Sequence, residues 1–285
     1  MAASEKDFAF LRDVMEKNSS NRLEGPNKEF FQRRLARLAD HSGVNGVGTF
    51  VEMLRASPSD CLDTVVAEAM TIKETSFFRD VAPFDLLRDK LIPQLIQKRQ
   101  HEKRLLFWSA ASSTGQEAYS LAMLIQDYFP QLMDWDVRII GTDISKPACD
   151  YAREGRYRRL EVNRGLPVKL LLRHFDREGE QWRVKPELRS MVEFRRLNLC
   201  APVGVLPKFD VVLLRNVLLY FNVEDRKQVL REVHNRMSHD AVLLLGAAEQ
   251  AEDSSELFRV ELDSSCYFYR PVPAAGGLRL VPERS

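Results

Sequence analysis

The chain has 285 residues, of which 45% are hydrophobic, so it can fold into one large or two smaller domains with a well-packed core. Its 42 Lys and Arg residues balance its 41 Asp and Glu residues, which argues against a broad nucleic-acid-binding surface. No apolar run is long enough to cross a bilayer, and no hydrophobic signal core follows the first residues. We therefore expect a cytoplasmic protein that does not insert into membranes.

The four cysteines are far apart and the five histidines form no HExxH motif. Cysteines without a CxxC pair are more typical of reduced, buried thiols than of zinc ligands or a disulfide framework. We therefore expect no metal site.

The first 80 residues are predicted to form a helical domain, because their apolar residues recur three and four positions apart. The helical segments are 8–15, 30–38, 51–54 and 62–70, with a loop at 43–48. Three arginines make one side of the second segment basic, which is typical of a solvated helix face. They are Arg33, Arg34 and Arg37. Helical spacing continues over residues 87–95, where Pro93 is expected to break or restart the helix.

A turn rich in Ser, Ala and Gly follows the first predicted strand. The strand is the apolar run 105–108, the turn covers 109–117, and a helix follows at 118–125. A junction of this kind presents free backbone N–H groups, and Gly115 allows the backbone to approach a ligand closely. The turn is not a GxGxxG motif and lacks the Lys-Ser/Thr of a phosphate-cradling loop. Taken alone, the turn is equally typical of a ligand-binding loop and of an ordinary strand-to-helix loop.

Three further predicted strands end in polar residues. Strand 137–143 ends in Asp143, which is placed either to accept hydrogen bonds from ribose hydroxyls or to cap the helix that begins near Ser145. Strand 191–199 ends near Asn198. The apolar strand 210–214 runs into Arg215 and Asn216. Open α/β sheets bind ligands at the carboxyl ends of parallel strands, so these residues predict a site for a nucleotide-like cofactor.

The segment 157–191 does not fit a simple crossover between parallel strands. We expect a helix at 166–175 and a turn within 176–184 that leads into a short strand. The last sheet elements are a strand at 241–246 and an antiparallel edge hairpin made of 257–262 and 266–270. Residues 271–285 contain three prolines and two adjacent glycines, which indicates a loose tail.

Six motifs follow one another along the chain. They are Glu74-Thr75-Ser76-Phe77-Phe78-Arg79, Trp108-Ser109-Ala110-Ala111-Ser112-Ser113-Thr114-Gly115-Gln116-Glu117, Gly141-Thr142-Asp143-Ile144-Ser145, Gly155-Arg156-Tyr157, Asn198-Leu199, and Arg215-Asn216-Val217-Leu218-Leu219-Tyr220-Phe221. Each alone is weak, but the ordered set resembles the CheR-type chemotaxis receptor methyltransferases, which use S-adenosylmethionine to esterify glutamates on chemoreceptors. The resemblance extends from about residue 5 to 270.

The resemblance implies an α/β fold: the Rossmann-like sheet of class I S-adenosylmethionine (SAM)-dependent methyltransferases. It implies a helical receptor-docking domain at 1–80, a methyltransferase domain at 81–270 with a small β subdomain inserted at 157–191, and a flexible tail at 271–285. The implied cofactor is S-adenosyl-L-methionine, which is converted to S-adenosyl-L-homocysteine. The implied partner is the cytoplasmic helical domain of chemoreceptors, for which the basic side of segment 30–38 is then a docking surface. Some family members also bind a receptor tether through the β subdomain. Because the segment around Gly179 is short here, we expect docking without a tether.

The family pattern assigns cofactor contacts to matching residues of this chain. Glu117 is expected to meet the methionine ammonium and Asp143 the ribose hydroxyls. Asn198 and Leu199 are expected to border the adenine, and Asn216, with Arg215 beside it, to line the methionine side.

Three more residues are expected to lie near the reacting atoms. Thr75 and Arg79 should close over the cofactor, with Arg79 pairing the methionine carboxylate or orienting the acceptor glutamate. Tyr220 is the hydroxyl expected near the methyl group, so Arg79 and Tyr220 are the catalytic candidates. Alternatively, Tyr220 is a core aromatic and Arg79 a surface residue. Lys73 stands where the family usually has Asn and is left out of the cofactor set.

The same residues also bear on three other classes of function. Methyl transfer to nucleic acid or a small molecule is disfavoured, because no Asn/Asp-Pro-Pro-Tyr motif for exocyclic amines is present. A receptor-interaction module that binds the cofactor without turnover stays open, although the full set of polar strand ends argues against loss of activity. A nicotinamide-dependent oxidoreductase requires a glycine pattern that the turn at 109–117 lacks.

Overall fold

The computed structural model describes residues 6, 7, 10, 36, 39, 44, 46–56, 74–204, 206–263 and 266–273. The predicted helix 62–70, the basic arginines at 33, 34 and 37, Lys73 and the tail beyond 273 lie outside these residues, as do most of segments 8–15 and 30–38. The helix predicted at 51–54 is present and begins earlier, as α3 (Val47–Ala56). Its buried residues Val47, Phe50, Val51 and Leu54 follow helical spacing.

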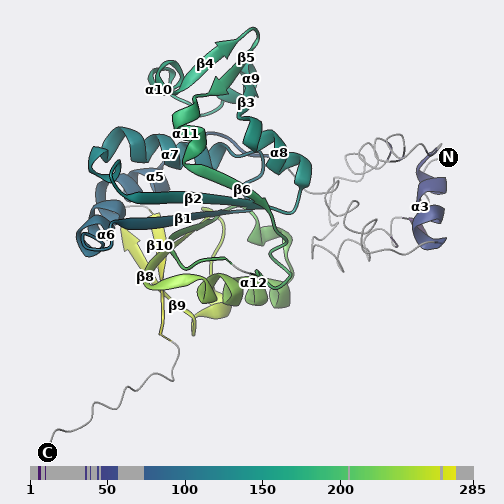
Figure 1. Ribbon diagram of the computed structural model, residues 1–285. Helices are drawn as coiled ribbons and strands as arrows, with labels where there is room; N and C mark the ends of the chain where they lie inside the picture. The colour runs from purple at the N-terminus through teal and green to yellow at the C-terminus, as the bar shows by residue number, and fades with distance from the viewer. Residues whose placement is uncertain are drawn as a thin grey trace, which may run out of the picture.

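A seven-stranded sheet lies at the centre of the described chain from residue 74 onward (Figure 1). In spatial order its strands are β6 (Val192–Arg196), β2 (Asp136–Asp143), β1 (Arg104–Ala110), β7 (Phe209–Leu214), β8 (Met237–Leu245), β10 (Cys266–Pro271) and β9 (Phe258–Asp263). The first five run parallel, and β10 and β9 are antiparallel additions at one edge. This arrangement confirms the predicted Rossmann-like α/β fold and the predicted edge hairpin.

The strand order reverses beside β1. The chain builds β1, β2 and β6 towards one edge, and it then returns to place β7 and β8 on the other side of β1. In open parallel sheets, loops leave this point in opposite directions and open a crevice at the carboxyl ends of the strands. The topology therefore predicts a ligand site at the ends of β1, β2 and β7.

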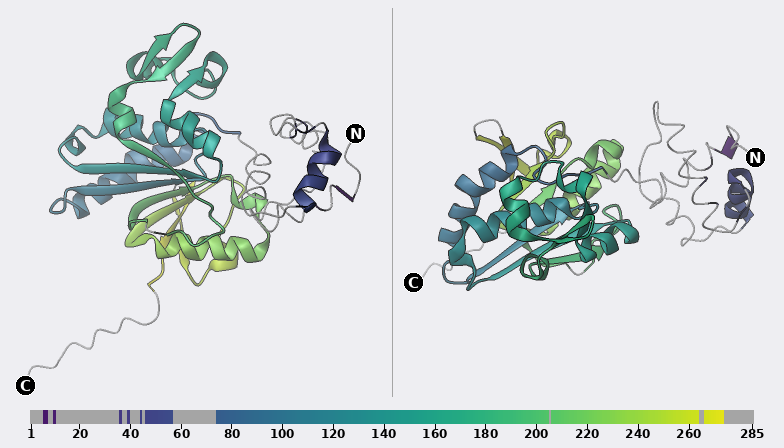
Figure 2. Two further views of the ribbon diagram at one scale, coloured as in Figure 1. Left: turned by 45° about the vertical axis from the view of Figure 1, so that its right-hand side comes forward. Right: turned by 90° about the horizontal axis from the view of Figure 1, so that it is seen from above.

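Helices cover both faces of the sheet (Figures 1 and 2). Alternate residues of β1 point to opposite faces: Leu105 and Phe107 belong to one hydrophobic cluster, and Leu106 and Trp108 to the other. The first face carries α5 (Ala82–Leu86), η1 (Leu87–Leu91), α6 (Ile92–Lys98), α7 (Gln116–Tyr128) and α8 (Lys146–Glu154). The second face carries α12 (Val223–Asn235). Short 3-10 turns are η2 (Pro130–Leu132), η3 (Leu218–Tyr220) and η4 (Glu252–Ser254).

Pro93 does not interrupt the helix, because α5, a π-helical turn at Leu87–Leu91 and α6 form one continuous helical run with Pro93 in the first turn of α6. The N–H of Ile92 donates to the carbonyl of Leu87 across the π-helical turn. This wider turn accommodates a proline, which has no N–H to donate. The sequence pattern did not predict the π-helical turn.

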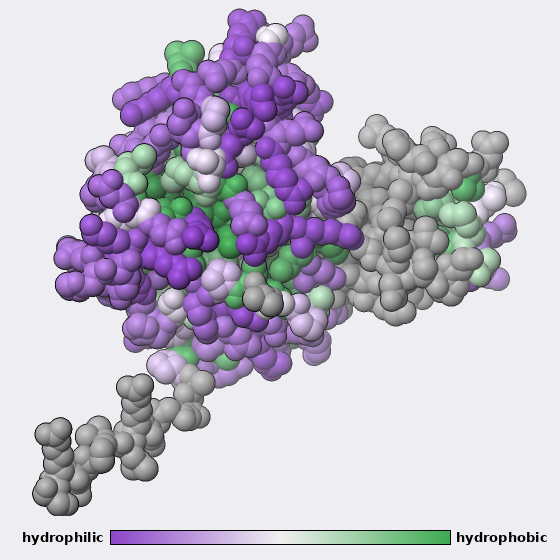
Figure 3. Space-filling model, in the orientation of Figure 1, coloured by the Kyte–Doolittle hydropathy of each residue, from purple (hydrophilic) through white to green (hydrophobic). Residues whose placement is uncertain are grey.

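A small three-stranded antiparallel sheet forms from residues 156–184. Its order is β3 (Arg156–Arg158), β5 (Gln181–Val184) and β4 (Phe175–Glu178), with α9 (Arg159–Val162), α10 (Val168–His174) and α11 (Pro186–Ser190) around it. The predicted helix and the short strand are present as α10 and β5. Residues 176–178, expected in a turn, pair with β5 as part of β4 because Phe175 is buried and starts a strand. The surface of this subdomain is mostly hydrophilic in the view of Figure 3.

The segment Glu74–Asp80 packs between the small subdomain and α7. Phe77 is fully buried and makes edge-to-face contacts with Tyr157 and Phe175, with ring centroids 5.1 and 5.6 Å apart. The N–H of Phe78 donates to Ser120 Oγ at 2.9 Å. A Cβ on Gly165 would lie 2.1 Å from the carbonyl oxygen of Phe77, so only glycine allows this close approach. The segment is therefore held from both sides.

Gly115→Ala should destabilise the fold through two separable effects. Gly115 has φ +93°, and an added Cβ would lie 2.8 Å from the Cβ of Ala152 and 2.9 Å from Phe194. We expect a loss of about 2–5 kcal/mol in the free energy of unfolding, from left-handed backbone strain and overpacking together. Chemical denaturation measures this loss.

Gly179→Ala is the matched control, because Gly179 has φ +62° and a Cβ there would meet nothing within 4 Å. Backbone strain alone predicts a loss of about 1–2 kcal/mol. Equal losses for the two variants would show that close packing around Gly115 does not matter.

Candidate active site

A pocket opens at the carboxyl ends of the parallel strands, where the topology predicts it. The empty space within it and at its open mouth is about 930 Å³. All nine residues singled out from the sequence line this pocket. They are Thr75, Arg79, Glu117, Asp143, Asn198, Leu199, Arg215, Asn216 and Tyr220. They come from five separate stretches of chain, and the fold brings all of them together.

The turn after β1 forms one wall of the pocket. Ala111 and Ser113 have φ values of 58° and 50°, so the backbone turns sharply before α7 begins at Gln116. The hydroxyl groups of Ser112 and Ser113 are buried and have no hydrogen-bond partner among the described protein atoms. Buried polar atoms are seldom left without partners. Their presence in the pocket fits a polar ligand that completes their hydrogen bonds.

Asp143 ends β2 with its carboxylate fixed by the backbone. Oδ2 accepts a hydrogen bond from the N–H of Ser113 and Oδ1 from that of Ser145, both at 2.8 Å. The helix cap of α8 is Ser145 itself, whose side chain accepts from the N–H of Ala148. The alternative that Asp143 serves only as that cap is therefore wrong. Its carboxylate ties the turn after β1 to the end of β2.

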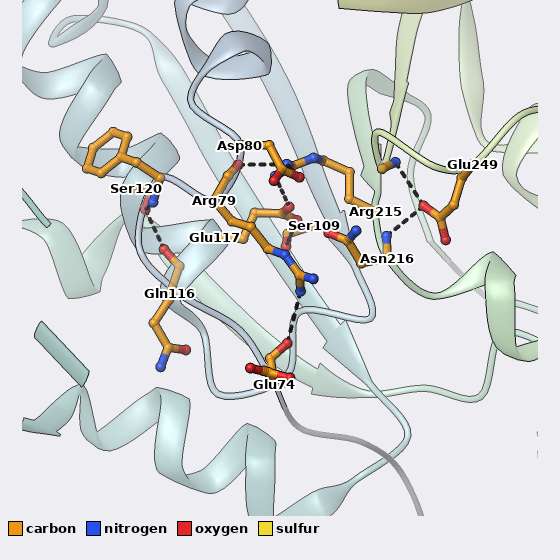
Figure 4. A network of polar contacts seen from close by, with 12 residues as sticks. Glu74, Arg79, Asp80, Ser109, Gln116, Glu117, Ser120, Arg215, Asn216 and Glu249 are labelled. Atoms are coloured by element: carbon orange, nitrogen blue, oxygen red, sulfur yellow. Dashed lines mark hydrogen bonds and ion pairs between the residues drawn. The ribbon is translucent and has the colours of Figure 1, made fainter. Parts of the chain in front are cut away.

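Arg215 is an almost fully buried ion-pair centre behind the pocket wall (Figure 4). One guanidinium nitrogen donates to Glu117 Oε2 at 2.9 Å, and the other donates to Asp80 Oδ2 at 2.9 Å and to the backbone carbonyl of Arg79 at 2.6 Å. Glu117 Oε1 also accepts a hydrogen bond from the hydroxyl of Ser109 at 2.7 Å. The two carboxylates exceed the one guanidinium by a single negative charge, so the cluster favours a cationic ligand group.

The two catalytic candidates come from different segments of the pocket wall. Arg79 is partly exposed and donates to the backbone carbonyl of Glu74 at 3.1 Å. Tyr220 is also partly exposed in η3 and belongs to neither hydrophobic cluster, so the core-aromatic alternative is wrong. Burial raises the pKa of the Tyr220 phenol above its usual value, and nearby Arg79 lowers it to a lesser extent. The hydroxyl is therefore protonated at neutral pH.

Asn198 and Leu199 follow β6 and form the far side of the pocket. Asn198 Oδ1 accepts the N–H of Cys200 at 3.0 Å, and Leu199 is buried. Together with Ile144 and Leu197 they give this side an apolar lining with one amide group. Such a surface suits a flat heterocycle that stacks on apolar atoms and makes a few directed hydrogen bonds.

Sequence reasoning missed Glu249 and Asp80. Glu249 follows β8 and is 7% exposed, and its carboxylate accepts backbone N–H groups from the loop after β7. Asp80 completes the ion-pair cluster around Arg215. One signal was available for Glu249, because it is an acid close after a parallel strand, as Asp143 is. Asp80 offered no signal, since its partner lies far away in the sequence.

Two further observations concern only the described part of the chain. No group of three or more His, Cys, Asp or Glu side chains is placed to hold a metal ion there. Over the same residues, no helix has the length and apolar character needed to span a membrane.

Comparison with known proteins gives the family. The family model described as "CheR methyltransferase, SAM binding domain" matches residues 73–266. "Chemotaxis protein methyltransferase 1" of Pseudomonas aeruginosa is 37% identical over 276 residues, which are 95% of this chain and 99% of that protein. "Chemotaxis protein methyltransferase Cher2" of Pseudomonas putida is 37% identical over 87% of this chain and 92% of its own length. A "Chemotaxis protein methyltransferase 1" of Vibrio cholerae is 34% identical over 83% of this chain and 86% of its own length.

Likeness to solved structures is weaker. A TehB-like SAM-dependent methyltransferase from Corynebacterium glutamicum is 12% identical, with a TM-score of 0.37, over 64% of this chain and 86% of that one. This likeness is too low to bear on function. The family match and the curated relatives decide the question: the chain belongs to the CheR methyltransferase family, and its cofactor is S-adenosylmethionine.

Proposed function

We propose that the protein transfers a methyl group from S-adenosylmethionine to glutamate side chains of chemoreceptors, and that it does so in the cytoplasm. The products are glutamyl methyl esters and S-adenosylhomocysteine. One observation carries the proposal: a single pocket joins an anionic cluster and buried hydroxyls suited to the cofactor with Arg79 and Tyr220, which suit a carboxylate acceptor. The names of the curated relatives support the chemotaxis role.

The cofactor contacts follow from the chemistry of each wall. Glu117, within a cluster of net negative charge, would hold the methionine ammonium. Asp143, at the end of β2, would accept the ribose hydroxyls. Asn198 and Leu199 would border the adenine, and Asn216 would line the methionine side. Arg215, whose guanidinium donates to Glu117, Asp80 and a backbone carbonyl, would act on the methionine side by positioning Glu117.

The acceptor needs no general base. When bound, S-adenosylmethionine supplies an electrophilic methyl carbon on a positively charged sulfonium. A glutamate carboxyl has an unperturbed pKa of about 4.3, so the acceptor oxygen is already ionised at neutral pH. Arg79 would orient that carboxylate, or else pair with the methionine carboxylate, and Thr75 would close beside it. The Tyr220 hydroxyl would donate one hydrogen bond that steers the oxygen without removing its nucleophilicity. Such alignment can lower the activation barrier by roughly 7–11 kcal/mol.

The protein must also recruit its receptor. Residues 177–182 form a tight β4–β5 hairpin whose tip holds Gly179. We propose that receptor docking depends on the N-terminal helical domain and needs no tether peptide at this hairpin.

Asp143→Asn should weaken cofactor binding. Asparagine keeps the size of the side chain but removes the charge that strengthens hydrogen bonds to ribose hydroxyls. We expect the Kd for S-adenosylhomocysteine, measured by calorimetry, to rise about 10- to 150-fold, as loss of about 1.5–3 kcal/mol predicts. Asp150→Asn is the control, because Asp150 lies on the exposed side of α8, outside the pocket lining, and pairs with Lys146 and Arg153. Unchanged binding by Asp143→Asn would remove Asp143 from the cofactor site.

Labelled methyl groups from the cofactor should appear on glutamates of chemoreceptor cytoplasmic helices as base-labile ester. Tyr220→Phe should lower kcat about 10- to 100-fold and leave S-adenosylhomocysteine affinity nearly unchanged, if the hydroxyl acts only on the acceptor. Base-stable label would indicate a different acceptor. No label on any of several receptors would favour a module that binds the cofactor without turnover.

The rate should depend little on pH between about 6 and 9. The acceptor carboxylate is ionised over that range. The Tyr220 phenol stays protonated, because its pKa is raised above the usual value of about 10. Single-turnover rates across this range test both points. A rate that rises tenfold per pH unit would indicate a required general base and contradict the proposed mechanism.

A further inference from the structure

Glu249 is a buried acid that lies behind the pocket and does not line it. It follows β8 in a turn closed by the hydrogen bond from its own N–H to the carbonyl of Gly246, at 2.9 Å. Its side chain folds back so that Oε2 accepts the N–H groups of Asn216 at 2.6 Å and Gly246 at 2.8 Å (Figure 4). Oε1 accepts the N–H of Leu219 at 3.3 Å. One carboxylate therefore joins the loops that follow β7 and β8.

The charge of Glu249 is balanced by backbone groups. Within residues 74–204, 206–263 and 266–273, no Lys, Arg or His side chain forms an ion pair with it. A buried carboxylate is costly unless hydrogen bonds stabilise its charged form, and here three N–H groups do so. An ionised carboxylate has two oxygens that only accept, whereas an amide has one oxygen and a donating NH₂ group. Glutamine at this position would therefore point its NH₂ group at backbone N–H groups, so that donors would face donors.

The loop held by Glu249 is closely packed. Asn216 has φ 57°, in the left-handed region that Asn adopts more readily than most other non-glycine residues. A Cβ on Gly246 would lie 2.6 Å from Glu249 Oε2 and 2.8 Å from Asn216 Nδ2. The side chains of Glu249 and Asn216 thus meet against a position that only glycine can occupy. The hydrogen bond from the Asn216 N–H to Glu249 fixes a backbone conformation that Asn tolerates.

The same carboxylate holds both ends of the segment that forms one pocket wall. Asn216, at its start, lines the cofactor side, and Tyr220, at its end, is the proposed acceptor-side hydroxyl. Glu249 binds the N–H of Asn216 and that of Leu219, the residue before Tyr220. Its charge also contributes to keeping the Tyr220 phenol protonated. Glu249 thereby sets the distance between the cofactor side and the acceptor side of this wall.

We propose that Glu249 is a positioning residue for methyl transfer, which fixes the segment Asn216–Tyr220 so that the cofactor side and the acceptor side of the pocket stay in register. This inference rests on the proposed function, because it assigns Tyr220 to the acceptor. Glu249 itself touches neither reactant. Displacement of reacting groups by about 1 Å can lower a rate on the order of a hundredfold, so a residue behind the wall can control kcat.

Glu249→Gln tests the proposal, with Glu252→Gln as the control. Glu252 lies three residues further on and is exposed, and its side chain makes no hydrogen bond to the described residues. We expect Glu249→Gln to lower kcat about 10- to 100-fold per cofactor-binding site, with the KM for the receptor changed less than about threefold. Calorimetric titration with S-adenosylhomocysteine gives the number of intact cofactor-binding sites. Dividing the rate by that number separates slower catalysis from partial unfolding. Wild-type kcat per site in Glu249→Gln overturns the proposal.

A double-mutant cycle separates positioning from general stability. In the Tyr220→Phe background, Glu249→Gln should lower kcat less than about threefold further, because both changes disable the same contact. Effects that multiply fully overturn the proposal. If Glu249→Gln yields no folded protein, Glu249→Asp replaces it, since aspartate keeps the charge and shortens the reach by one methylene. Its kcat should lie between those of the wild type and the Tyr220→Phe variant, and wild-type kcat would overturn the proposal.

A second cycle needs no methyl acceptor. Glu249→Gln and Asn216→Ala, measured alone and together by S-adenosylhomocysteine calorimetry, should weaken binding less than multiplicatively. If the wild-type protein methylates no receptor, the proposed function fails, and this binding cycle still decides whether Glu249 positions Asn216. If the wild type methylates receptors and either cycle is multiplicative, the positioning role fails and the proposed function stands.

Discussion

The pocket depends on one buried guanidinium. Arg215 follows β7 with 1% of its side chain exposed, and its partners come from two regions: the 74–80 segment and the first turn of α7. A buried arginine is tolerated when its charge is paired, and here both terminal nitrogens donate to acceptors while Nε has no partner among the described atoms. Removing one charged partner costs about 3–5 kcal/mol. The sheet end, the helix and the segment that carries Thr75 and Arg79 are thus bound to each other through a single group.

Four acids in and around the pocket have different tasks because their partners differ. Asp143 and Glu249 accept backbone N–H groups and fix loops. Asp80 and Glu117 share the guanidinium of Arg215, and the unbalanced negative charge of that pair is the feature that suits a cationic amino acid group. Backbone N–H groups and a guanidinium can each stabilise a carboxylate. Backbone groups add no net charge, whereas the guanidinium of Arg215 cancels one of the two carboxylate charges of Asp80 and Glu117.

The sequence predicted the architecture well because buried parallel strands leave a clear pattern. Residues 211–214 are continuously apolar, as β7 requires with both faces covered, and the polar residues after them could be assigned to a strand end. Asp143 and Asn198 could be placed in the same way. The π-helical turn at Leu87–Leu91 left no such pattern, since its apolar spacing resembles that of an α-helix. Ion pairs across long separations, such as Asp80 with Arg215, arise only when the chain has folded. Glu249 was missed because a glycine and two alanines separate it from the end of β8, so no acid stands directly at the strand end.

Strand β1 pairs with β2 on one side and β7 on the other, although the small subdomain and β6 intervene in the sequence between β2 and β7. The crevice beside β1 therefore exists only after distant parts of the chain have met, and pairings of this kind form slowly. A small molecule that binds the finished crevice and not the unfolded chain adds RT ln(1 + [L]/Kd) to the stability of the folded state. The supply of methyl donor in a cell would thus govern how much of this protein survives proteolysis, as well as how fast it works.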